Sequence, residues 1–102
     1  MKKALIMAPM GSVHRRFNQP NIKALLDLGY EVHLLANFED GEGAESNNST
    51  YAEAEKSRGI IIHSLPFARH SLLKNINNVF RTRELLKDNH FDIIHASYSS
   101  FR

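Results

Sequence analysis

The feature that most constrains this chain is an alternation of short apolar runs with segments of helical periodicity. The apolar runs cover residues 4–8, 30–36, 60–65 and 91–95. Short continuous runs of this kind are typical of strands buried on both faces of a parallel sheet. Strands that alternate with helices are joined by right-handed crossovers, so helices should cover both faces of the sheet. We therefore predict an α/β fold, a Rossmann-like three-layer sandwich of four parallel strands in the order 3-2-1-4.

Three helices are expected between these strands. The first begins near Pro20 and stops at Gly29, because proline suits a helix start and glycine a helix end. Thr50 and Glu53 match a capping box, which predicts a second, short helix from Thr50 that runs to Gly59. Residues 37–49 are rich in Asn, Glu, Gly and Ser, so we expect a solvated loop that buries little. The third helix, long and amphipathic, takes Ser71 as its cap and has apolar positions at Leu72, Leu73, Ile76, Val79, Phe80 and Leu86.

Length and composition narrow the class of protein. A chain of 102 residues with 42% hydrophobic and 24% charged residues fits one globular domain, here residues 1–102. A formal net charge of +2 without a basic block does not indicate nucleic acid as a partner. The absence of cysteine excludes disulfides and thiolate metal sites, and we expect a cytoplasmic protein. No run approaches the roughly 20 apolar residues of a transmembrane helix, and the apolar run after Lys3 is interpreted as a strand, not as a signal peptide.

The candidate site follows from the predicted strand order. Ligands of open parallel sheets bind where the strand order reverses, here beside the loops after strands one and four, at residues 9–16 and 95–100. Glycine allows close backbone approach, and N–H groups at a helix start favour anionic or hydroxyl-rich ligands. A plain turn, a solvated basic corner and a packed histidine are the alternative interpretations of these residues. The predicted substrate-binding residues are Gly11, Ser12, His14, Arg16, His95 and Ser97.

Several other site chemistries find no support in the sequence. Only one glycine follows the first strand, so the dinucleotide fingerprint is absent and no cofactor is expected. The six histidines contain neither an H-x-x-x-H nor an H-E-x-x-H pair, so no metal site is expected. The serines that follow the last strand lack the G-x-S-x-G pattern of a hydrolase. No catalytic residue is assigned.

Several segments together resemble a known family. The most telling is the proline-aromatic-x-Arg-x-Ser segment before a Lys-Asn-Ile helix start. The segments are Met1-Lys2-Lys3-Ala4-Leu5-Ile6, Gly29-Tyr30-Glu31-Val32-His33, Leu65-Pro66-Phe67-Ala68-Arg69-His70-Ser71, Lys74-Asn75-Ile76 and Phe91-Asp92-Ile93-Ile94-His95. With them the chain resembles, over essentially its whole length, the N-terminal domain of bacterial family 4 glycosyltransferases of capsule, exopolysaccharide and O-antigen synthesis.

The resemblance implies a two-domain GT-B enzyme of which this chain is the acceptor-binding half, the donor-binding C-terminal domain being absent. It implies a retaining, metal-independent transfer from a nucleotide sugar to a glycan or lipid-linked acceptor, at the inner membrane face and with peripheral contact to anionic lipid. The family often has His-x-His after the last strand. Here Ser97 takes the place of the second histidine, so His95 is expected to orient the loop or the acceptor and not to act as the base. The isolated fragment is expected to be inactive.

Two other function classes remain open from the residues alone. One is a stand-alone flavodoxin-like binding or regulatory module, although the acidic cluster of receiver domains is absent after the first strand. The other is the N-terminal part of a sugar-nucleotide epimerase, which shares the fold plan and would act on a soluble sugar nucleotide alone.

Overall fold

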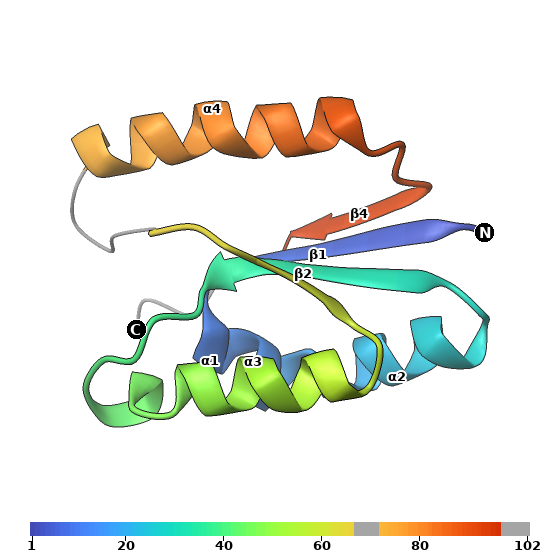
Figure 1. Ribbon diagram of the computed structural model, residues 1–102, viewed down its shortest axis with the longest axis horizontal. Helices are drawn as coiled ribbons and strands as arrows, with labels where there is room; N and C mark the ends of the chain where they lie inside the picture. The colour runs from blue at the N-terminus through green and yellow to red at the C-terminus, as the bar shows by residue number, and fades with distance from the viewer. Residues whose placement is uncertain (67–71, 97–102) are drawn as a thin grey trace.

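The computed structural model describes residues 1–66 and 72–96. In the described residues, four parallel strands are separated by helices, with two α-helices between the first and second strands and a short 3-10 helix before the third α-helix (Figure 1). In chain order they are β1 (Lys3–Met10), α1 (Gly11–Phe17), α2 (Gln19–Asp27), β2 (Glu31–Asn37), η1 (Gly43–Glu45), α3 (Asn48–Ser57), β3 (Ile61–Ser64), α4 (Leu72–Asp88) and β4 (Ile93–Ala96).

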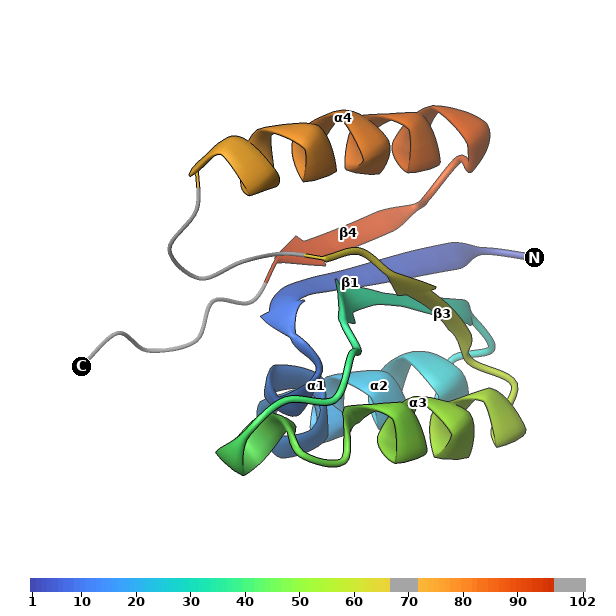
Figure 2. The same ribbon diagram turned by 60° about the vertical axis from the view of Figure 1, so that its left-hand side comes forward.

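The strands form one sheet in the order β3-β2-β1-β4, and every neighbouring pair is parallel. Helices α1, α2 and α3 cover one face of this sheet, and α4 covers the other (Figures 1 and 2). The predicted α/β fold and strand order are confirmed. Because β2 and β4 lie on opposite sides of β1, the strand order reverses between β1 and β4.

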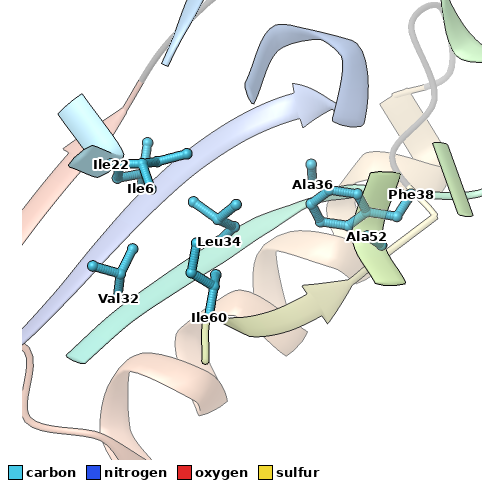
Figure 3. Packing of buried hydrophobic residues seen from close by; sticks show 8 residues of the cluster. All are labelled: Ile6, Ile22, Val32, Leu34, Ala36, Phe38, Ala52 and Ile60. Carbon is cyan, nitrogen blue, oxygen red and sulfur yellow. The ribbon is translucent and has the colours of Figure 1, made fainter. Parts of the chain in front are cut away.

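Two apolar layers hold the helices to the sheet, because successive residues of a strand point to opposite faces. Leu34 points to the α1–α3 side and belongs to the larger cluster (Figure 3). Leu35 points to the α4 side and packs with Leu5 and Leu65. The larger cluster consists of Ile6, Ile22, Val32, Leu34, Ala36, Phe38, Ala52 and Ile60.

Burial differs between central and edge strands. Ala4, Leu5 and Ile6 of β1 are fully buried, as expected of a strand covered on both faces. In β4 all side chains are exposed, and Ile94 is 51% exposed. The expectation that every apolar strand is buried on both faces is therefore wrong for the two edge strands, β4 and also β3, whose Ile61 is 38% exposed, because the helices cover the central strands more completely than the edges.

The helix ends were predicted with mixed success. Gly29 and Gly59 follow α2 and α3 with φ of 85°, a left-handed conformation that favours glycine, so both predicted stops are confirmed. The capping box at Thr50 is wrong, since α3 already begins at Asn48 and the side chain of its N-cap residue, Asn47, makes no capping hydrogen bond. Ser71, the predicted cap of α4, lies outside the described residues.

Two segments expected to be loops have more structure than predicted. Residues 11–17 form helix α1 directly after β1. Residues 37–49 were expected to bury little, yet Phe38 is 4% exposed and Asn48 is 1% exposed. The burial arises because both side chains pack over Gly11, a contact between distant parts of the chain. Across residues 1–66 and 72–96, no helix is long and apolar enough to cross a bilayer.

Candidate functional site

The candidate site lies at the carboxyl end of β1, where the strand passes without a loop into α1. This transition places Gly11, Ser12 and His14 in one helix and buries all three. His95 lies in β4 as the register partner of Ile6, and it is exposed. Register partners in a parallel pair share a face, so His95 extends from the face that α1, α2 and α3 cover. Ser97 lies outside the described residues.

Gly11 is covered by the segment that follows β2. A Cβ atom at this position would lie 2.9 Å from Cδ1 of Phe38 and 3.0 Å from Oδ1 of Asn48. Both distances are shorter than ordinary van der Waals contacts. In this structure glycine is therefore required so that Phe38 and Asn48 can approach the start of α1.

The polar atoms of Ser12 are held by a side chain from η1. The Ser12 backbone N–H donates to Oε1 of Glu45 at 3.2 Å, and the Ser12 hydroxyl donates to Oε2 of the same carboxylate. Nδ2 of Asn48 also donates to Oε1 of Glu45, at 2.9 Å. Glu45 thus supplies the start of α1 with the cap that its own sequence lacks.

His14 is fully buried and uses both ring nitrogens. Its Nε2 lies 3.0 Å from the carbonyl oxygen of Leu35, and its Nδ1 lies 3.1 Å from Nδ2 of Asn18. The carbonyl can only accept and the amide nitrogen can only donate, so His14 is the neutral tautomer with its proton on Nε2. Burial lowers the pKa of His14 to about 4. The ring therefore ties α1 to β2 and presents no unused nitrogen to a ligand.

The two arginines of α1 differ in their surroundings. Nη2 of Arg15 donates to the carbonyl oxygen of Ala44 at 2.9 Å and fastens η1 to α1. Arg16 is exposed at the end of α1, next to Phe17, which is 66% exposed. The structure brings Gly11, Ser12 and His14 together, whereas the ligand-binding role of all six predicted residues stays a prediction.

Sequence reasoning missed three residues of this edge, namely Phe38, Glu45 and Asn48. They lie in the segment predicted to be solvated, and they reach Gly11 and Ser12 from about 30 positions along the chain. No local pattern distinguishes Glu45 from the other acids of this segment, Glu39, Asp40 and Glu42. Oδ1 of Asn48 is buried and has no hydrogen-bond partner among the described residues.

The acidic segment is itself fastened to α3. Both the backbone N–H and the hydroxyl of Ser49 donate to the Asp40 carboxylate, at 2.8 and 2.7 Å. These hydrogen bonds lower the pKa of Asp40. With four acids and no base between residues 39 and 47, the segment covers this edge of the sheet with negative charge.

A second polar network fixes α3 against the start of α2. Nε2 of Gln19 donates to the hydroxyl of Tyr51 at 2.7 Å, and this hydroxyl donates to Oε2 of Glu55 at 2.7 Å. Burial and the Glu55 carboxylate raise the pKa of Tyr51. Glu55, itself buried, pairs with Arg58 at 2.7 Å. Among the residues that the structure describes, no group of three His, Asp or Glu side chains could hold a metal ion.

Comparison with known proteins gives one match. The sequence model of Glycosyltransferase Family 4 matches residues 21–101, which is most of the chain. The matched range includes His95 and Ser97, whereas Gly11, Ser12, His14 and Arg16 precede it. No curated protein and no solved structure matches the chain.

Proposed function

The chain belongs to glycosyltransferase family 4, and on this premise we propose that it forms the acceptor-binding half of a two-domain GT-B enzyme. The donor, a nucleotide sugar, would bind mainly to a second domain that is not in this sequence. The family match favours this function over a flavodoxin-like module or a sugar-nucleotide epimerase. A retaining, metal-independent mechanism is part of the proposal and rests on the family resemblance.

The observation that supports the acceptor side is the carboxylate of Glu45 at the start of α1. A donor diphosphate needs cations or unoccupied N–H groups, but here the N–H of Ser12 already donates to Glu45. A second negative charge at this position would be repelled. Sugar hydroxyls, in contrast, are uncharged donors and acceptors that carboxylate, amide and hydroxyl groups recognise well.

An acceptor hydroxyl would compete with Ser12 for the Glu45 carboxylate. Ser12 is 6% exposed, so the segment that contains Glu45 has to move before Ser12 can contact a ligand. Gly11, Ser12 and His95 then line the proposed acceptor edge together with Arg16 and Ser97. His14 supports this edge indirectly, because its hydrogen bond to the carbonyl oxygen of Leu35 ties α1 to β2.

We also propose that the enzyme acts in bacterial surface polysaccharide synthesis, on the cytoplasmic side of the inner membrane. Arg16 and Phe17 are neighbouring exposed residues at the end of α1, and such a pair suits an interface with anionic lipid. Flotation with phosphatidylglycerol vesicles should recover the chain, and vesicles of phosphatidylcholine should recover less. Equal recovery from both would contradict the contact with anionic lipid.

Sugar transfer by the chain alone tests the two-domain proposal. We expect no transfer when the purified chain is incubated with a panel of nucleotide sugars and lipid-linked glycans, because no second domain holds the donor against the acceptor. Transfer above the level of a boiled control would contradict the assignment to one half of the enzyme. It would leave the family membership intact.

A further inference from the structure

Two histidines of neighbouring strands are joined on the α4 side of the sheet. Nδ1 of His33 in β2 lies 2.8 Å from Nε2 of His63 in β3. The ring planes are nearly parallel, at 5°, with ring centroids 5.1 Å apart. On its other side His33 places Nε2 at 2.7 Å from the Glu31 carboxylate. The three side chains form a row from β2 to the edge strand β3, away from the candidate site.

The ring nitrogens that carry protons in this row can be worked out from the atoms that accept hydrogen bonds. The hydrogen bond with His33 lowers the pKa of Glu31, so its carboxylate is ionised at neutral pH and accepts a hydrogen bond from the Nε2–H of His33. In a neutral His33 ring Nδ1 is then an acceptor, and Nε2 of His63 must donate to it. One proton therefore lies between the rings. If the pair takes up one more proton, this proton can bind Nδ1 of His63, and the hydrogen bond between the rings remains. A further proton would have to bind Nδ1 of His33, so that both facing nitrogens would be donors.

His33 lies in buried surroundings. His33 is 3% exposed and contacts the ring of Phe91 edge to face, with centroids 4.9 Å apart. Burial, together with His33, lowers the pKa of His63.

The charged groups around the pair are few. Beside Glu31, β1 contributes Lys3, whose Nζ lies 3.9 Å from the Glu31 carboxylate. The chain's amino group also acts on Glu31, and Asp92 accepts from the backbone N–H of Lys3. From α4, the side chains that reach the sheet are the apolar Leu85 and Leu86. The charged side chains near the end of α4, namely Glu84, Lys87 and Asp88, are exposed. His90, which follows α4, is exposed as well.

Strand β3 pairs with β2 along four residues, and Ile62 of β3 and the following Leu65 pack against the two apolar clusters, so the histidine pair adds to these contacts. The strand has a single neighbour, β2, and it ends where the N–H of Leu65 donates to the carbonyl oxygen of Ala36 at 3.0 Å. The hydroxyl of Ser64 accepts the N–H of Phe38 at 3.1 Å, and Phe38 covers Gly11. If β3 loosened, the hydrogen bond between Ser64 and Phe38 would be released, and Phe38, which covers Gly11, would lose this support.

We propose that the His33–His63 hydrogen bond is a proton-operated clasp. It fastens β3 to β2 while a single proton lies between the two rings, and it releases β3 when a second proton binds between them, at Nδ1 of His33. This inference does not depend on the proposed function.

Amide hydrogen exchange of the 102-residue chain tests the clasp. The opened pair takes up one more proton than the closed pair, at an ordinary histidine pKa near 6.5. After correction for intrinsic exchange, the opening constant of the Leu65 amide should therefore rise about 30-fold from pH 8 to pH 5. The amide of Ile6 in the central strand reports global unfolding, and its opening constant is subtracted. His33→Asn offers an acceptor to Nε2 of His63 but cannot titrate, and His63 can take up its proton at Nδ1 with that hydrogen bond intact, so the pH dependence of its Leu65 amide should fall well below 30-fold.

His90→Gln is the matched control, because it removes an exposed histidine and should leave the 30-fold rise unchanged. If H33N fails to fold, ¹⁵N spectra of the wild-type rings decide instead. At pH 8 they should show protons on Nε2 of both His33 and His63. Equal pH responses of Leu65 in the wild type and H33N, or two rings that each take up a proton at pH 5 with β3 still protected, would overturn the proposal.

Discussion

His14 shows how one residue can combine a predicted position with an unexpected role. Its place after the first strand suggested a ligand contact, but both ring nitrogens are bonded within the protein. The local sequence contains no sign of this, because the partner of Nε2 is the backbone of Leu35 in another strand. The consequence is a buried, neutral imidazole at the centre of the fold, with a pKa lowered to about 4.

Replacing His14 by glutamine should change how stability depends on pH. Between pH 6.5 and pH 4 the unfolded chain binds a proton at His14 that the folded chain excludes. The contribution of His14 is therefore complete above pH 6.5 and falls by about 3 kcal/mol as the pH drops to 4. In urea denaturation the wild type should exceed H14Q most at pH 7.5, with a gap that narrows in acid. A gap that stays constant with pH would show that His14 is not held neutral, and His90→Gln serves as the control.

At the scale of helices and strands, the elements that are marked by a pattern in their own or neighbouring residues could be predicted. The apolar runs located all four strands, and Gly29 and Gly59 marked where α2 and α3 end. Helix α1 was missed because its first turn is capped by Glu45, a residue 33 positions away, and not by a neighbour. The burial of Phe38 and Asn48 was missed for the same reason. The candidate site could thus be located at the end of β1, but its closure by the acidic segment could not.

Removing the carboxylate of Glu45 should loosen the start of α1. Glu45→Ala takes away the acceptor of the Ser12 N–H and hydroxyl and leaves Nδ2 of Asn48 with one acceptor fewer. We expect a loss of about 1–2 kcal/mol in the free energy of unfolding, as for the loss of a helix cap. Amide exchange at Ser12 should accelerate.

Glu42→Ala is the control for this loss, because Glu42 is an exposed acid of the same segment. Its effect should stay within about 0.5 kcal/mol. An equal loss in E42A and E45A would assign the effect to the charge of the whole segment and contradict a specific cap by Glu45.

At the scale of the whole molecule, the strand order locates the candidate site at the end of β1, and the family match covers the part of the chain that follows α1. The sheet reverses its order between β1 and β4, and the family match covers residues 21–101. One face of the sheet supports α1 and the acidic segment, while the other supports α4 and the histidine pair (Figure 2). The central claim is that the α1 edge receives the acceptor and not the donor.

Binding followed by ¹⁵N NMR of the chain tests this claim most directly. Titration with uncharged oligosaccharides from bacterial surface polysaccharides should shift the amide signals of Gly11, Ser12 and Glu45. Titration with UDP-glucose or GDP-mannose at the same concentrations should leave these signals in place, because the Glu45 carboxylate repels the diphosphate. The opposite pattern, shifts at Gly11 and Ser12 with the nucleotide sugars and none with any oligosaccharide, would contradict the assignment of this edge to the acceptor.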